Sequence, residues 1–313
     1  MSAPANQPPF SKRVEYALHA GVLFFFLRLS RLLGIERASA LGAILGRRLA
    51  GPLLRRPRTY QNIGYAFPEL SHAEATTLID GMGENLGRTI AELAQFDRLG
   101  SHIKVEGREH IDAARSLGKP LLVVSGHFAN WEALLLGLNR AGLQCAAMAR
   151  PPNNPWVARW IAKNRAMGGL RDQFAKGPEG TRQMLSDIRK GGDIVLLIDQ
   201  NLAEGVPVPL FGRPALTAST PAALAVKGMV TVLPVALLRD TGCDSTFRCS
   251  LPLLPAGPGN NEADILAMMG EINRFIEARI RERPAHWLWM HDRWKPAPGL
   301  SRRAKRVLGS GAD

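Results

Sequence analysis

The 313-residue chain is long enough for one large α/β domain or two small ones, and its 46% hydrophobic residues exclude a disordered or low-complexity protein. The formal net charge is +13, and residues 1–58 (ten Lys/Arg against Glu15 and Glu36) carry +8 of it. Residues 295–313 carry a further +4. Basic residues at the two ends, rather than along a groove, indicate an anionic surface as partner and not nucleic acid.

The N-terminal region predicts a membrane-associating segment. Residues 1–13 are expected to be disordered and residues 14–58 to form basic, apolar helices. The charge-free run from Tyr16 to Leu27 has only twelve residues, fewer than the roughly 18 to 20 that a spanning helix needs. No small-residue cleavage site of a secretory signal follows it. Tyr16–Ile35 is therefore interpreted as a helix in a membrane interface, with a buried core helix as the alternative.

Residues 59–298 are predicted to form one α/β domain, followed by a basic tail at 299–313. The pattern is helical to about residue 100, and from residue 120 short apolar runs alternate with helical stretches. This alternation predicts a mostly parallel central sheet flanked by helices, with functional loops at the carboxyl ends of the strands. The predicted strands are 121–125, 144–149, 170–174, 193–199, 230–237 and 246–254.

The segment LLVVSGHFANWE points to a catalytic histidine. Leu121–Ser125 is expected to be a buried strand, with His127 in the loop after it and a helix from Asn130 to Leu138. On one regular helix His127 and Glu132 would lie about 140° apart, but a histidine in the loop can turn back to the glutamate. A carboxylate on one imidazole nitrogen leaves the other free to take a proton. A structural histidine beside a glutamate is the alternative that spacing leaves open.

Other site types have no support in the sequence. Ser125 stands in the wrong order for a G-x-S-x-G nucleophile elbow, and no second histidine lies at zinc spacing beside His127. Cys145, Cys243 and Cys249 form no CxxC pair and no metal-ligand spacing, which is typical of reduced packing residues in a cytosolic protein. We therefore expect no metal and no cofactor, and a His-carboxylate dyad that activates a hydroxyl of the substrate.

GHFANWE resembles the HxxxxD/E motif of the glycerolipid-type (lysophospholipid) acyltransferases, in the glutamate form of the lipid A biosynthesis lauroyl and myristoyl transferases. The likeness runs from about residue 14 to residue 295. Besides GHFANWE, five segments carry it: NIGYAFPELS (62–71), ARPPNNPWVARWIAKNRAMGG (149–169), DQN (199–201), FGRPALTASTPAALA (211–225) and HWLWMHDRWK (286–295).

The resemblance implies a membrane-associated enzyme that moves a fatty acyl chain from acyl carrier protein to a hydroxyl of a lipid A precursor. It would work at the cytoplasmic face of the inner membrane, without an acyl-enzyme, with His127 as general base and Glu132 as its orienting partner. The motif does not choose the acceptor, so a lysophospholipid or an amino-acid-derived lipid stays open. A non-catalytic membrane or nucleic-acid binder is the rival from another class, and it predicts that His127→Ala leaves function intact.

Further residues are assigned to substrate binding on the same resemblance. Arg165 would hold a phosphate of the acceptor or of the carrier's phosphopantetheine, with a surface helix arginine as the alternative. Asp199 and Gln200 end a predicted buried strand, where polar residues serve either a site or a cap. The remaining candidates are Arg150, Asn154 and Arg213.

Two other features are interpreted as structural. PEGTR (178–182) copies a phosphate-binding motif of the wider acyltransferases, but it precedes the strand at 193–199 and is expected to begin a helix. The tryptophans of the C-terminal block are expected to pack in the core rather than at a membrane interface. His286 and His291 are treated as structural.

Overall fold

The computed structural model describes residues 9–255 and 262–295. The basic tail predicted at 299–313 and most of the N-terminal segment predicted to be disordered lie outside these ranges. Helix α1 (Phe10–Leu33) begins inside that N-terminal segment, and Gly34, at φ 78°, separates it from α2 (Ile35–Leu45). The predicted N-terminal apolar helix is therefore present, and it is longer than expected.

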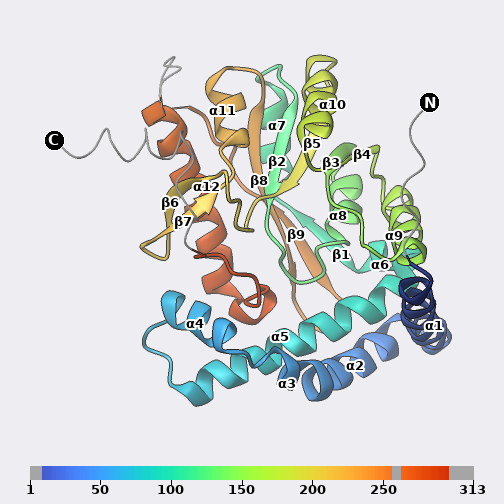
Figure 1. Cartoon of the computed structure of the whole chain (residues 1–313). Coiled ribbons are helices and arrows are strands. Elements are labelled where there is room, and N and C mark those ends of the chain that lie inside the picture. The colour runs from blue at the N-terminus through green and yellow to red at the C-terminus, as the bar shows by residue number, and fades with distance from the viewer. Residues whose placement is uncertain (1–8, 256–261, 296–313) are drawn as a thin grey trace.

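Helices continue to residue 102. After α2 come a π-helical turn (Gly46–Ala50), α3 (Gly51–Leu54), α4 (Pro57–Ala66), α5 (His72–Glu92) and α6 (Phe96–Leu99). Two 3₁₀ turns, η2 (Leu93–Gln95) and η3 (Gly100–His102), flank α6. Ser71 and Glu74 form a capping box that starts α5. Helices α2 to α5 run beneath the sheet in Figure 1.

A seven-stranded sheet forms the centre of the molecule (Figure 1). Its order is β1-β9-β8-β2-β5-β3-β4, and every neighbouring pair is parallel except β8 and β9. The predicted mostly parallel sheet is confirmed. The strands are β1 (Ile103–Glu106), β2 (Leu121–Ser125), β3 (Cys145–Met148), β4 (Asp172–Phe174), β5 (Asp193–Leu197), β8 (Thr231–Arg239) and β9 (Ser245–Cys249).

Three strands of the structure are not among those predicted from the sequence. In β1 apolar residues alternate with charged ones and the strand ends in Glu106, so the sequence contains no continuous apolar run there. β6 (Val206–Leu210) and β7 (Arg213–Thr217) form an antiparallel hairpin, whose turn residues Phe211 and Gly212 have φ of 52° and 70°. The prolines of this hairpin argue against a strand in the sequence. A separate two-stranded ribbon tolerates them, because both of its strands are edge strands.

Helices cover both faces of the sheet, so β2 is buried on both sides. Leu121 and Val123 face a core built with α7 (Arg108–Arg115) and α8 (Leu134–Arg140). Leu122 and Val124 face the other core, built with α10 (Pro178–Arg189), α11 (Thr220–Val226) and α12 (Glu262–Glu282). Helix α9 (Pro155–Met167) lies beside α1, and η4 (Pro284–His286) follows α12.

Two structural interpretations are confirmed and one boundary is corrected. PEGTR begins α10, the helix before β5. Trp287, Trp289 and Trp294 are buried in one core cluster. The helix expected from Asn130 begins instead at Leu134, after a turn in which the Asn130 side chain accepts a hydrogen bond from the Ala133 backbone N–H (3.2 Å).

Candidate active site

His127 lies where two parallel strands end side by side. β2 and β5 are neighbours with Ser125 opposite Leu197, so the loops that leave them meet at the same edge of the sheet. Asp199 comes two residues after β5. Its Oδ1 lies 2.7 Å from His127 Nδ1, and its Oδ2 accepts the His127 backbone N–H at 2.7 Å. The indole N–H of Trp287 also donates to Oδ2, at 2.7 Å. The carboxylate that orients the imidazole is therefore that of Asp199.

These contacts determine the charge state of the pair. Burial works to raise the pKa of Asp199, but the His127 charge and the hydrogen bonds to His127 and Trp287 lower it to about 2. Burial likewise opposes the imidazolium, but Asp199 and, more weakly, Glu132 raise the pKa of His127 above its usual 6.5. An ionised Asp199 keeps the neutral imidazole proton on Nδ1, which leaves Nε2 as a proton acceptor.

The expected contact between His127 and Glu132 is wrong. The Glu132 carboxylate accepts two hydrogen bonds from Arg165 instead, Nε to Oε2 at 2.8 Å and Nη2 to Oε1 at 2.6 Å. Glu132 is buried, so its charge needs a fixed partner, and α9 supplies the guanidinium. Arg165 also donates to Gln173 Oε1 at 2.7 Å. Glu132 thus acts on His127 through its field and not by contact.

The loop that carries His127 is held in an unusual backbone conformation. Ala129 has a φ of 43°, a region that non-glycine residues rarely adopt. Its N–H donates to the His286 carbonyl at 2.9 Å. Its carbonyl accepts from Asn85 (3.3 Å) and from Thr89 (3.2 Å), both on α5. Helix α5 therefore supports the loop from below and fixes the position of His127.

A pocket of about 500 Å³ opens beside His127. Gln200 reaches its wall, with Nε2 3.4 Å from His127 Nε2 and 3.3 Å from His291 Nε2. Burial and the charge of His127 lower the pKa of His291, so this second histidine stays neutral beside the first. The apolar lining comes from Leu134, Leu135, Ala147, Met148, Ala149, Leu170, Val195 and Leu197, and the polar lining from His127, Trp131, Glu132, Arg150, Arg165, Lys176 and Gln200.

The structure brings most of the sequence candidates together. His127, Glu132, Arg150, Arg165 and Gln200 line the pocket, and Asp199 lies behind the imidazole. Two candidates lie outside this lining. The Asn154 side chain accepts hydrogen bonds from the first turn of α9 and donates to the Tyr16 carbonyl at 2.8 Å, and the Arg213 guanidinium stacks over Tyr65 at 4.3 Å.

Sequence reasoning missed several residues of the site. Lys176 follows the carboxyl end of β4, so the rule about strand ends would have found it. Trp131 lies inside the GHFANWE motif but was not singled out. The sequence predicts structural roles for His291 and Trp287, and their approach to Gln200 and Asp199 shows that they also support the site.

Comparison with known proteins decides the family. The model of the bacterial lipid A biosynthesis acyltransferases matches residues 6–296, nearly the whole chain. The chain belongs to this family. It is therefore an acyltransferase, and the resemblance seen in its motifs is confirmed.

Two relatives within the family come from Escherichia coli (strain K12). A lipid A biosynthesis lauroyltransferase is 27% identical over 274 residues, covering 82% of this chain and 85% of the relative. A lipid A biosynthesis palmitoleoyltransferase is 26% identical over 292 residues, covering 89% and 90%. A phosphatidylinositol mannoside acyltransferase of Mycobacterium tuberculosis (strain ATCC 25618 / H37Rv) is 26% identical over 214 residues, covering 67% and 64%. Relatives of similar identity thus act on different acceptors.

Proposed function

We propose that this lipid A acyltransferase moves a fatty acyl chain from acyl carrier protein to a hydroxyl of a lipid A precursor, with His127 as general base. The observation that carries the proposal is the 2.7 Å contact between His127 Nδ1 and a buried, ionised Asp199, which leaves Nε2 basic beside a partly apolar pocket. Asp199 is the positioning residue, in the place that the sequence analysis had given to Glu132.

In the proposed reaction the acyl chain passes directly from the carrier thioester to the acceptor hydroxyl, and no acyl-enzyme forms. Nε2 of His127 takes the proton of the acceptor hydroxyl while that oxygen attacks the thioester carbonyl carbon. The tetrahedral intermediate then expels the carrier thiolate, which recovers the proton from His127. The Gln200 amide, beside His127, is a suitable donor to the oxyanion formed in between.

The two kinds of pocket wall suit the two parts of the substrates. Leucine, methionine and valine side chains suit the acyl chain, because each buried methylene contributes about 0.8 kcal/mol. Arg150 and Lys176 suit phosphate groups, and no ion pair engages either of them among the described residues. The Arg165 charge is already balanced by Glu132, so we assign to Arg165 the role of shaping the pocket and not that of binding phosphate.

We propose that α1 lies in the cytoplasmic interface of the inner membrane. By length and composition α1 qualifies as a membrane span, because an 18-residue stretch of it has a mean hydropathy of 1.3. However, one side of it docks on the protein, where Phe24 packs against Trp160 and Arg31 pairs with Asp97 at 2.8 Å. A helix attached along its side suits an interface better than a crossing. Its exposed side carries an apolar stripe, beside which the charged Lys12, Arg13, Glu15 and Arg28 are also exposed. The stripe consists of Phe10, Val14, Leu18, Val22, Phe25, Leu29 and Leu32.

Acyl transfer in detergent tests the proposal. Labelled acyl groups of several lengths would be offered on acyl carrier protein to a tetraacylated, Kdo-bearing diglucosamine lipid. We expect turnover by the wild type and by His110→Ala, a control outside the pocket, and a loss of about 10²-fold or more in His127→Ala. Mass spectrometry of enzyme incubated with donor alone should show no acylated chain. Equal turnover by His127→Ala and the wild type would overturn the mechanism.

The acceptor is tested in the same assay, because the phosphatidylinositol mannoside relative shows that related chains use other lipids. The panel would add a lysophospholipid, a glycosylated phospholipid and an amino-acid-derived lipid. Activity on one of these, with none on the diglucosamine lipid, would replace the lipid A precursor as substrate and leave the His127 mechanism in place.

A further inference from the structure

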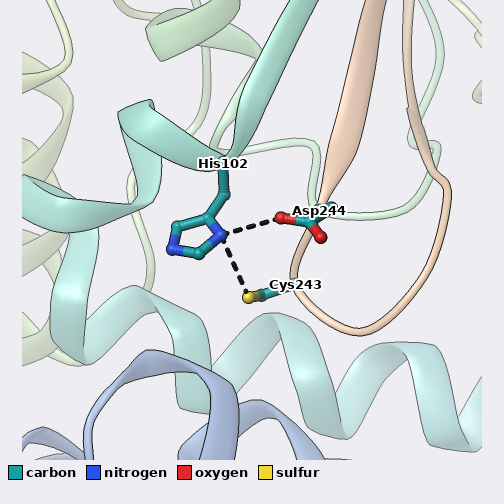
Figure 2. A group of neighbouring side chains, drawn as sticks. All are labelled: His102, Cys243 and Asp244. Carbon is teal, nitrogen blue, oxygen red and sulfur yellow. Dashed lines mark hydrogen bonds and ion pairs between the residues drawn. The ribbon is translucent and has the colours of Figure 1, made fainter.

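Three side chains with metal-binding atoms meet at one end of the sheet, outside the lining of the active-site pocket. His102 ends η3, just before β1, and Cys243 and Asp244 lie in the turn between β8 and β9. His102 Nδ1 lies 2.8 Å from Asp244 Oδ1 and 3.4 Å from Cys243 Sγ. Figure 2 shows both side chains directed at the same nitrogen, and the three donor atoms lie within 4.8 Å of one another.

Strand pairing and hydrogen bonds set the backbone that carries the three donors. β1 and β9 are parallel with Ile103 opposite Ser245, so the residues just before them, His102 and Asp244, are neighbours. The turn is closed by a hydrogen bond from Asp244 N–H to the Thr241 carbonyl at 2.9 Å. The buried Arg239, paired with Glu92, donates to the Gly242 carbonyl at 2.7 Å. The fold therefore sets the backbone positions from which the three side chains reach one another.

The geometry differs from that of a catalytic relay. A Cys-His-Asp relay uses both ring nitrogens, one toward the thiol and one toward the carboxylate. Here the sulfur and the carboxylate both approach Nδ1, which carries at most one proton. One nitrogen proton cannot serve both directions equally, whereas a cation placed between the three atoms is attracted to all of them.

The spacing suits zinc. Typical Zn–S and Zn–N bond lengths in a tetrahedral site place sulfur and nitrogen about 3.6 Å apart, and nitrogen and oxygen about 3.4 Å apart. The Cys243–His102 distance of 3.4 Å is already near the first value. Asp244 must move outward by about half an ångström to reach the second. Its side chain is 58% exposed and has room to do so.

The electrostatic surroundings also favour a cation. The charges of the Glu92, Asp244 and Glu36 carboxylates act on the Cys243 sulfur. The field at the sulfur is therefore negative, although Arg239 offsets part of the Glu92 charge. A negative field stabilises a divalent cation placed in it.

We propose that His102, Cys243 and Asp244 bind one Zn²⁺ ion, which ties the β8–β9 turn to the start of β1. A thiolate, an imidazole and a carboxylate together are a donor set that selects zinc over the oxygen-preferring Mg²⁺ and Ca²⁺. The site stabilises the fold by binding linkage and takes no part in acyl transfer. It does not depend on the function proposed above.

Metal titration of the full chain tests the site. Protein in detergent, stripped with a chelator and dialysed, would be titrated with Zn²⁺ against a chromophoric competitor, and with Co²⁺ to record thiolate-to-cobalt absorption in the near ultraviolet. We expect one Zn²⁺ per wild-type chain. Cys243→Ala and His102→Ala should each weaken binding by about 100-fold or more, since even groups that only support ligands are worth 10- to 100-fold. Zn²⁺ should raise the Tm of the wild type but not of Cys243→Ala.

Controls keep the test decisive. Cys249→Ala and His110→Ala remove a cysteine and a histidine outside the cluster and should leave affinity within about twofold of the wild type. Asp244→Asn changes an exposed side chain that should not impair folding, and it should weaken binding by about 10-fold or more. Wild-type affinity no higher than that of Cys243→Ala, or a cobalt band that survives in Cys243→Ala, would overturn the proposal.

Discussion

His127 and Asp199 are 72 residues apart in the chain and meet at 2.7 Å because β2 and β5 are neighbours in the sheet. The contact fixes the imidazole at one nitrogen and leaves the other for chemistry. Asp199 is buried, and a second residue contributes to this. Trp287 covers the carboxylate and donates to it, so the carboxylate does not open onto the pocket.

The pH dependence of kcat/KM should report the raised pKa of His127. A general base works only when neutral, so activity should rise with pH, with a slope of one, and level off above a pKa higher than 6.5. In Asp199→Asn the counter-charge is absent and burial remains, so the apparent pKa should fall. Initial rates from pH 5 to 9 measure both. A wild-type pKa at or below 6.5 would contradict the assignment.

Asp199→Asn should lower kcat by about 10²- to 10⁴-fold with little effect on folding. An asparagine amide can turn its NH₂ toward Nδ1, which moves the imidazole proton to Nε2 and blocks the base. The matched control is Asp193→Asn, because Asp193 is a buried carboxylate at the opposite end of β5 and pairs with Arg115. Single-turnover rates compare the two. Similar losses in both would indicate a fold effect and not a wrong tautomer.

Glu132 and Arg165 should behave as a pair in stability measurements. Removing one partner leaves an uncompensated buried charge, so Glu132→Gln or Arg165→Gln alone should lower the free energy of unfolding by about 3 to 5 kcal/mol. The double variant should lose less than the sum of the two, which urea unfolding would measure.

Activity of the same variants separates the two possible roles of Glu132. If Glu132 oriented His127 directly, Glu132→Gln would lose as much kcat as Asp199→Asn, whatever residue stood at position 165. The structure predicts instead that Glu132→Gln lowers the kinetic pKa, because its charge contributes to that of His127. If the losses in the free energy of unfolding of the Glu132 and Arg165 variants simply added in the double variant, the two side chains would not be energetically paired.

Gly87→Ala should destabilise the helical layer under the sheet. A Cβ on Gly87 would lie 2.0 Å from the Gly42 carbonyl oxygen and 2.7 Å from Gly46 Cα, both backbone atoms of the segment packed on α5. We expect a loss of about 1 to 3 kcal/mol in the free energy of unfolding. Gly64→Ala, with nothing within 4 Å of its new Cβ and a helical position in α4, should be neutral or stabilising. Unfolding curves that do not differ between the two would refute the close packing.

Charge on the exposed face of α1 should weaken membrane binding. Val22 and Phe25 are 72% and 75% exposed, so Val22→Asp and Phe25→Asp should fold and still lose about tenfold or more in affinity for anionic vesicles. Leu117→Asp places the same charge at an exposed leucine after α7 and should bind normally. Vesicle flotation at low and high salt separates the apolar contribution to membrane binding from the electrostatic one, because salt screens only the contribution of the basic residues. Unchanged binding of the α1 variants would exclude α1 as the anchor.

Local patterns in the chain predict the mostly parallel sheet and the position of His127 at a strand end, but not β1 or the β6–β7 hairpin. Runs such as LLVVS and DIVLL are short, continuously apolar and separated by helical stretches, which is the signature of parallel strands buried on both faces. His127 at the end of one such strand follows from the same pattern. The placement of PEGTR at the start of α10 needed only the position of the next strand.

Only the tertiary structure decided which groups meet. Strand order is not encoded in any local stretch, so the choice between Glu132, five residues from His127, and Asp199, 72 residues away, depended on β5 packing next to β2. The meeting of His102 with Cys243 likewise follows from the pairing of β1 with β9, and no spacing in the sequence announces it. Local propensity acts over a few residues, whereas the contacts of His127 with Asp199 and of His102 with Cys243 are set by the packing of the whole sheet.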